Sequence, residues 1–136
     1  MNTLEIGSTA SLQAVVKAEM TAARFAANDG ERFPEVLATP FLIGDLERAC
    51  AILLEPLIEE GQLSVGASIQ VRHVAPTGVG GTYECVATYS GQEGPLYWFD
   101  VVATDSVGQI GKGRIARAIV NESEILKRGN SAAPNS

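Results

Sequence analysis

The stretch TPFLIGDLERACAILLEPLIEEG, residues 39–61, sets the architecture expected of this 136-residue chain. Thr39 followed by Pro40 predicts the start of a helix, with the threonine as N-cap and the proline at the first helical position. Pro56 and Gly61 mark its end. Apolar residues recur between them at helical spacing, namely Phe41, Leu42, Leu46, Ala49, Cys50, Leu53 and Leu57. Because they cover more than half of the circumference, we expect a buried helix, as though wrapped by a sheet.

Four stretches after this helix predict strands joined by short links that are rich in turn residues. They cover residues 64–74, 82–90, 96–104 and 110–120, and an earlier strand is expected over residues 10–16. Short links favour antiparallel neighbours, because a parallel crossover needs a dozen or more residues. Residues 17–30 are interpreted as a mobile or partly helical flap, and residues 127–136 as a disordered tail. The sequence thus predicts a single α+β domain over residues 1–126, with about five antiparallel strands around one central helix.

The composition is that of a soluble globular protein, with 46% hydrophobic and 19% charged residues. A formal net charge of -6 argues against nucleic-acid binding, which needs a basic surface. No stretch reaches the ~20 apolar residues that cross a membrane, and the N-terminus lacks the features of a secretory signal. Cys50 and Cys85 fall in predicted regular elements, which indicates reduced thiols in the cytoplasm. With one histidine and no cysteine cluster, no metal site and no cofactor are expected.

The single histidine, His73, falls in a predicted strand on the face that carries apolar side chains. Side chains alternate between faces along a strand, so the face of this histidine is shared with Val65, Ala67, Ile69 and Val71. An imidazole there needs a hydrogen-bond partner, because burial removes its contacts with water. Either His73 is a satisfied core residue or it belongs to a functional site.

Glu47 is the candidate partner of His73. Its spacing from Ile43 and Cys50 places its carboxylate on an apolar stripe of the predicted helix. A glutamate at the edge of such a stripe can also reach out to water, and helix capping alone explains Thr39. Together, however, a hydroxyl at the helix start, a carboxylate two turns later and an inward histidine can converge on one pocket.

Arg117 is a charge among apolar neighbours in the last predicted strand, where it shares a face with Ile115 and Ile119. The pattern allows either a salt bridge to a nearby carboxylate or a contact with a ligand. Lys112 and Arg114, on the other face of that strand, are interpreted as solvated charges, with a position near the phosphates of a ligand as the alternative.

Three stretches resemble the fluoroacetyl-CoA thioesterase family of hotdog enzymes. They are RFPEVLATPFLIGDLE at residues 32–47, SVG at 64–66 with His73 seven residues after the glycine, and GKGRIARA at 111–118. The resemblance runs in register from about residue 33 to residue 120. It implies the hotdog fold, in which a curved antiparallel sheet wraps a central helix and two copies join edge to edge. A homodimer or a higher oligomer is therefore expected.

The resemblance also implies a set of site residues. In the family a threonine, a glutamate and a histidine form the catalytic set, and they fall on Thr39, Glu47 and His73. The family's substrate-contacting glycine and arginine fall on Gly66 and Arg117, and an aromatic residue of its acyl-pocket lid falls on Phe33.

The activity implied by the resemblance is hydrolysis of a small acyl-CoA thioester in a groove at the dimer interface. Glu47 is expected to act as general base or nucleophile with Thr39, and His73 to polarise the thioester or assist the departing thiolate. The Gly66 N–H is expected to stabilise the oxyanion, and a bulge near this glycine would turn it to the face of His73. Gly30 stands where the family's fluorine-selective member has a phenylalanine, so selectivity for fluoroacetyl-CoA does not follow.

A non-catalytic hotdog module that binds acyl-CoA or another small ligand is the alternative function. Such a module would show ligand affinity without release of a thiol. A hotdog dehydratase is a further enzyme class, but the differently spaced aspartate and histidine motif of that class is not found in this sequence.

Overall fold

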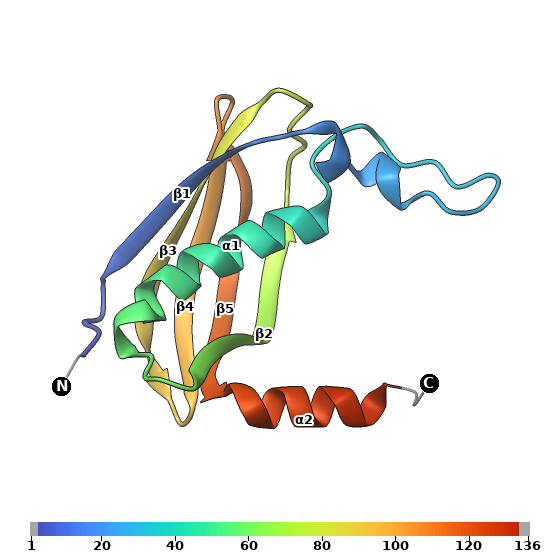
Figure 1. Ribbon diagram of the computed structural model, residues 1–136. Helices are drawn as coiled ribbons and strands as arrows, with labels where there is room; N and C mark the ends of the chain where they lie inside the picture. Colours follow the sequence, from blue (N-terminus) through green and yellow to red (C-terminus); the bar gives the residue numbers. More distant parts are fainter. Residues whose placement is uncertain (1–2, 134–136) are drawn as a thin grey trace.

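The computed structural model describes residues 3–133. An antiparallel sheet of five strands curves around the helix α1, Thr39–Leu54, which lies across one face of it (Figure 1). The strands are β1 (Thr9–Val15), β2 (Gln62–His73), β3 (Thr82–Glu93), β4 (Leu96–Asp105) and β5 (Gln109–Asn121). A second helix, α2, spans Glu122–Ala132. The α+β architecture predicted from the sequence is therefore confirmed.

The strand order is β1-β3-β4-β5-β2, which differs in one connection from the expectation. Short links do join antiparallel neighbours at β3–β4 and β4–β5, but β2 pairs with β5 and not with β3. The link of residues 74–81 instead passes over the end of the sheet (Figure 1). Three strand spacings are only about 14 Å, and eight extended residues reach about 26 Å, so a short link suffices for this crossover. As a result, β2 is an edge strand.

The core lies between α1 and the concave face of the sheet. Five side chains of α1 are fully buried there: Leu42, Leu46, Ala49, Cys50 and Leu54. They pack against buried residues of the strands, such as Tyr83 of β3, Phe99 of β4 and Ile115 of β5. One member of the predicted stripe, Phe41, lies in the first turn of the helix and is 38% exposed.

The start of α1 corrects one prediction. Ala38, with extended backbone angles, is the N-cap, and Thr39 is the first helical residue. No side chain caps the helix. The Thr39 hydroxyl is therefore not used by the orphan N–H groups of the first turn, and its partner lies elsewhere.

The C-terminal segment differs from the expected disordered tail. Residues 127–132 continue the helix α2, which runs sideways from the foot of β5 and is exposed along its length (Figure 1). Residues 134–136 lie outside the described part of the chain. Within the described part, no helix is long and apolar enough to cross a membrane.

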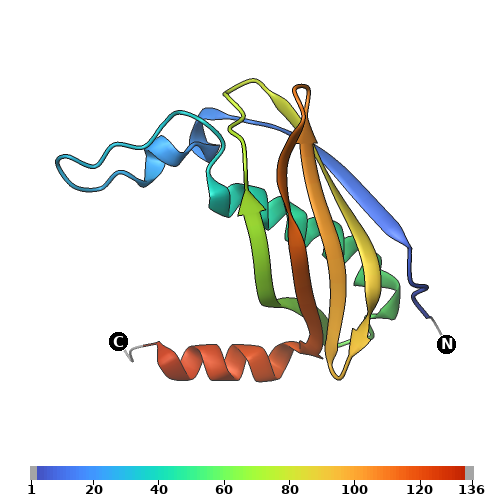
Figure 2. The same cartoon turned by 180° about the vertical axis from the view of Figure 1, so that it is seen from behind.

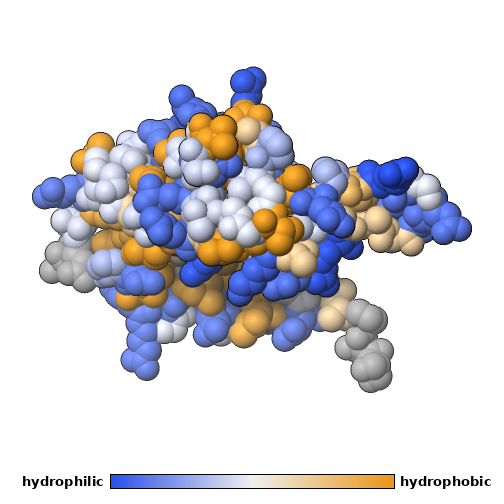
Figure 3. Space-filling model, turned by 90° about the horizontal axis from the view of Figure 1, so that it is seen from above, coloured by the Kyte–Doolittle hydropathy of each residue, from blue (hydrophilic) through white to orange (hydrophobic). Residues whose placement is uncertain are grey.

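Residues 21–38 form an arm that projects from the body (Figure 1). As expected of the flap, this region is partly helical, with short 3₁₀ turns at Ala18–Met20 and Ala22–Phe25. A bridge between Thr21 and Leu37 joins the two sides of the arm at its base, and a bridge between Val36 and Gly78 joins the arm to the link of residues 74–81. Seen from above, hydrophobic and hydrophilic residues are interspersed over this end of the molecule (Figure 3).

Candidate active site

Thr39 and His73 meet where the start of α1 lies beside the end of β2. The Thr39 Oγ1 and the His73 Nδ1 are 2.8 Å apart, within hydrogen-bond distance. Thr39 comes from the first turn of α1, and His73 is the last residue of β2. Two of the three predicted catalytic residues are thus in direct contact, although they are 34 residues apart in sequence.

The other nitrogen of the imidazole, Nε2, is buried and has no hydrogen-bond partner among the described residues. Burial lowers the pKa of His73 below its usual value of 6.5, and the backbone of Ala75 only partly opposes this effect. The imidazole is therefore neutral near pH 7. A buried polar atom without a partner is unusual in a folded protein, and here it leaves one donor or acceptor available to a ligand.

A hollow of about 300 Å³ lies beside this pair. Thr39 and His73 line it together with residues of the arm and of the crossover, namely Ala22, Pro34, Val36, Leu37, Val74, Ala75 and Pro76. The lining is largely apolar, with a hydroxyl and an imidazole as its polar groups. Small-molecule sites commonly combine these features.

Glu47 lies in a second cluster, farther along α1. Its Oε1 accepts a hydrogen bond of 3.0 Å from Arg117 NH1, which forms a salt bridge between α1 and β5. Arg117 also donates from Nε to Ser64 Oγ (3.2 Å) and from NH2 to Ser64 O (2.9 Å). The Arg117 side chain is 11% exposed and that of Glu47 28%. Of the two alternatives for Arg117, the salt bridge is therefore present, and the substrate contact stays a prediction.

Because Gly66 has no side chain, it leaves the space that the Glu47 carboxylate occupies. A Cβ built on Gly66 would stand 2.1 Å from Glu47 Oε1, so any side chain there would displace the carboxylate. The expected bulge is present, because the pairing of β2 with β5 shifts between Gly66 and Ser68 and leaves Ala67 unpaired. This bulge turns Gly66 to the same face as His73, although seven residues separate them.

The two clusters do not touch within one copy of the chain. Eight residues of α1 separate Thr39 from Glu47, which corresponds to about 12 Å along the helix axis. No hydrogen bond or ion pair among the described residues joins Glu47 to His73. The structure therefore brings Thr39 together with His73, and Glu47 together with Gly66 and Arg117, but leaves the two groups apart.

Phe33, the predicted lid residue, lies on the arm and is 45% exposed. It does not line the hollow, whereas its neighbour Pro34 does. The arm therefore walls the hollow on one side, and a covering role of Phe33 stays a prediction.

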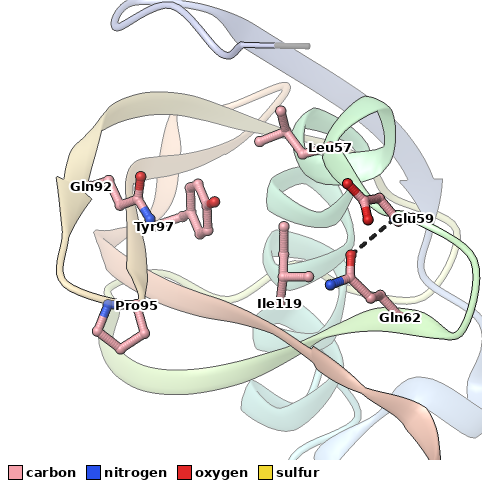
Figure 4. A pocket seen from close by; sticks show the side chains of 7 residues that line it. All are labelled: Leu57, Glu59, Gln62, Gln92, Pro95, Tyr97 and Ile119. Atoms are coloured by element: carbon pink, nitrogen blue, oxygen red, sulfur yellow. Dashed lines mark hydrogen bonds between the residues drawn. The ribbon is translucent and has the colours of Figure 1, made fainter. Parts of the chain in front are cut away.

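A second hollow, of about 320 Å³, opens at the far end of the molecule (Figure 4). Seven residues line it: Leu57, Glu59, Gln62, Gln92, Pro95, Tyr97 and Ile119. Gln62 Oε1 accepts a hydrogen bond from the Glu59 backbone N–H (3.0 Å). None of the predicted site residues lines this hollow, and we therefore place the candidate site at Thr39 and His73.

The sequence analysis missed the residues that hold the crossover in place. Thr77 is 5% exposed and donates from its hydroxyl to Asp105 Oδ2 (2.8 Å), while its carbonyl accepts from the Leu37 N–H (2.8 Å). The Thr77 hydroxyl, together with the N–H groups of Val107 and Gly108, holds the pKa of Asp105 below its usual value. These hydrogen bonds of Thr77 and Asp105 tie the arm, the crossover and the β4–β5 turn together. No local signal in the sequence pairs Thr77 with a residue 28 positions away.

Comparisons with known proteins agree with this geometry. The sequence profile of the fluoroacetyl-CoA-specific thioesterase family matches residues 16–123. A fluoroacetyl-CoA thioesterase from Streptantibioticus cattleyicolor is 39% identical over 89 residues, which make up 65% of this chain and 64% of that protein. The chain thus aligns with slightly less than two thirds of the length of that relative.

Solved structures extend the similarity over the fold. A structure of the fluoroacetyl-CoA thioesterase FlK superposes with a TM-score of 0.91 at 30% identity, over 98% of this chain and 100% of that chain. A thioesterase superfamily member from Thermus thermophilus matches with 0.84 at 26% identity, over 96% and 94% of the two chains. A hot-dog-like protein from Thermanaerovibrio acidaminovorans, at 20% identity and a TM-score of 0.82 over 98% and 96% of the chains, shares the hotdog fold. Variants of FlK have been solved with acetyl-CoA and with fluoroacetate and CoA.

Proposed function

Since the chain belongs to the fluoroacetyl-CoA-specific thioesterase family, we propose that it hydrolyses a small acyl-CoA thioester to the free acid and coenzyme A. The observation that carries this proposal is the Thr39–His73 pair, whose unpaired Nε2 lies beside an apolar hollow of about 300 Å³. A hollow of this size suits a short acyl group.

We propose that the working unit is a homodimer in which two copies join at β2. This strand is an edge of the sheet, and open edges in native proteins are usually covered or paired. In a two-fold antiparallel pairing of β2, the His73 end of one copy lies beside the Gly66 end of the other. The Glu47 carboxylate of the second copy then approaches Thr39 and His73 of the first, which removes the separation within one copy.

In the proposed reaction, water adds to the thioester carbonyl carbon and Glu47 accepts the proton of this water as general base. In the nucleophilic variant, the Glu47 carboxylate attacks the carbonyl carbon, the thiolate of coenzyme A leaves, and water then hydrolyses the resulting mixed anhydride to the free acid and the Glu47 carboxylate. Negative charge develops on the carbonyl oxygen, where the Gly66 N–H donates a hydrogen bond. The bond from carbon to sulfur then breaks, and the thiolate takes up a proton.

His73 supplies the remaining donor. If the Thr39 hydroxyl donates to Nδ1, the imidazole proton sits on Nε2 and points to the unpaired side. This N–H can polarise the carbonyl or protonate the departing sulfur. The proposal assigns Thr39 to holding that tautomer, and Arg117 to holding the Glu47 carboxylate through their salt bridge.

A thiol-release assay tests the activity. We expect the purified chain to release coenzyme A from short acyl-CoA thioesters, with acetyl-CoA and fluoroacetyl-CoA in the panel and a long-chain acyl-CoA as the control that the small hollow rejects. Thiol release at the uncatalysed rate with measurable acyl-CoA binding would instead identify the chain as a binding module.

We place the protein in the cytoplasm, which agrees with the free thiols of Cys50 and Cys85.

A further inference from the structure

Two cations lie opposite each other on the convex face of the sheet. Arg72 of β2 and Lys112 of β5 are direct partners in the antiparallel register, so their side chains lie on the same face. This face points away from α1. Gly111, the residue of β5 before Lys112, faces Leu42 of that helix, and side chains alternate between faces along a strand. Like charges directly opposite on neighbouring strands repel each other. A neighbouring anion would relieve this repulsion.

Among the described residues, no such anion belongs to the same copy of the chain. Both side chains are exposed, and within residues 3–133 no carboxylate lies within salt-bridge distance of either. Arg114, two residues farther along β5, is a useful contrast. It pairs with Asp100 (3.7 Å) and stacks on the Trp98 ring at 4.4 Å. The chain thus compensates one cation of this face internally and leaves the other two free.

Two uncompensated acids lie at the other end of β2. Glu122 and Glu124 form the first turn of α2 and are exposed, and neither has an ion pair within the described residues. The start of α2 is tied to the start of β2, because Gln62 pairs with Asn121 and the Glu122 N–H donates to Gly61 O (2.9 Å). Acids in a first helical turn are also favoured by the helix dipole, so their presence alone decides nothing.

The path of α2 connects these observations. The helix runs past β2, beyond the edge of the sheet, in both views (Figures 1 and 2). It therefore reaches into the space that a second copy occupies if two β2 strands pair. An antiparallel pairing centred on this strand sets Gln62 of one copy beside His73 of the other, and so sets the first turn of α2 near Arg72 and Lys112 of the other copy.

We propose that Glu122 and Glu124 of each copy pair with Arg72 and Lys112 of the other, and that α2 straps the dimer at the end of β2 that carries His73. The proposal rests on the homodimer of the proposed function and adds its electrostatic contacts. The two-fold axis repeats the contact, so four acids face four cations in each dimer. Exchange of charge is the direct way to test such complementarity.

The test uses two charge-reversal variants of the full chain and measures the dimer dissociation constant by sedimentation. Arg72→Glu/Lys112→Glu and Glu122→Lys/Glu124→Lys are each expected to weaken the dimer by about tenfold or more at low salt, and less at high salt. The second variant is decisive, because it brings the net charge closer to zero. If repulsion between whole molecules set the dissociation constant, the smaller net charge would tighten this dimer. Loss of the local ion pairs weakens it instead. Arg48→Glu, on the exposed side of α1, controls for net charge and should leave the dissociation constant unchanged.

Mixing the two variants provides the second readout. Each self-pair brings like charges together, but the mixed pair restores every contact, so native mass spectrometry should show mainly the heterodimer. Random pairing, in which about half of the dimers are mixed, would overturn the proposal, and so would a monomeric wild-type chain. Neither readout uses activity, and the thiol-release assay therefore decides the proposed hydrolysis independently.

Discussion

The two ends of the interface between α1 and β2 are built in opposite ways. At the end with Thr39 and His73, one nitrogen of the imidazole has no partner and the surrounding hollow is open. At the end with Glu47, Arg117 donates a hydrogen bond to the carboxylate, and Arg117 is itself held by two hydrogen bonds to Ser64. The first end is ready to receive a ligand, and the second holds a reactive group in a fixed position.

This difference shows why a single copy carries two incomplete halves. A catalytic acid or base must lie within hydrogen-bond reach of its target, and about 12 Å of helix separates Thr39 from Glu47. A two-fold rotation that places the open end of one copy beside the closed end of the other brings both functions together at one site. The predictions below separate the roles of the two ends.

The largest effect is expected at the closed end. Glu47→Gln keeps the size of the side chain and a carbonyl oxygen for Arg117, but it removes the base. We expect turnover to fall by at least ~100-fold, with the fold retained. Thiol release at matched folding checks this, and Glu60→Gln, an exposed acid of the same region, should retain wild-type turnover. An active Glu47→Gln variant would exclude this residue from the chemistry.

At the open end, His73→Ala is expected to lower turnover by about 100-fold, since it removes the imidazole whose Nε2 has no partner among the described residues. In the wild-type chain, burial lowers the pKa of His73 from 6.5, so the imidazole stays neutral until the pH falls below that value. The pH profile of kcat/KM should therefore show an acid limb below pH 6.5. Stability should also decline as the pH falls below 6.5, because the unfolded chain then binds the proton more tightly. An acid limb centred above 6.5 would contradict the buried, neutral imidazole.

Gly66→Ala tests how Gly66 positions the Glu47 carboxylate. Because Glu47 Oε1 occupies the place of the missing Cβ, the added methyl group should push the carboxylate away from its salt bridge. We expect kcat to fall by about tenfold with little change in the melting temperature, since the end of the glutamate side chain can move. Gly44→Ala is the matched control, because a Cβ there meets no atom within 4 Å. A fully active Gly66→Ala variant would remove the positioning role.

The smallest effect is expected at Ser64, which holds Arg117 and reaches the carboxylate only through it. Ser64→Ala removes one hydrogen bond to the Arg117 Nε and should lower the free energy of unfolding by about 1 kcal/mol. Turnover should stay within about threefold of the wild type. Denaturant unfolding and thiol release measure the two values, and a loss of turnover as large as that of Glu47→Gln would assign Ser64 to the chemistry instead.

The sequence predicted those features that local patterns specify. The spacing of apolar residues after Thr39 and Pro40 located α1, and alternation located the strands within a few residues. It did not predict the pairing of β2 with β5, because short links are compatible with a crossover at the end of a curved sheet. The helix α2 was missed because its sequence is polar and contains Gly129, and it packs on little besides the end of β5.

The candidate site was predictable as a set of residues but not as an arrangement. A charge or an imidazole on an apolar face is visible in the sequence, and this singled out Glu47, His73 and Arg117. Which of them are partners depends on long-range register, and here Thr39 joined His73 while Arg117 joined Glu47. The assignment of Thr39 to the N-cap was wrong for the same reason, since a tertiary partner claimed its hydroxyl.

Subunit complementation tests the central claim most directly. Glu47→Gln and His73→Ala are each expected to be nearly inactive, but a mixed dimer keeps one site with both residues if the site spans two copies. Random mixing makes about half of the dimers mixed, each with one intact site of two, so about a quarter of wild-type activity should return. If the mixture stays as inactive as its components while mass spectrometry shows mixed dimers, Glu47 and His73 do not meet across the dimer interface and the account is wrong.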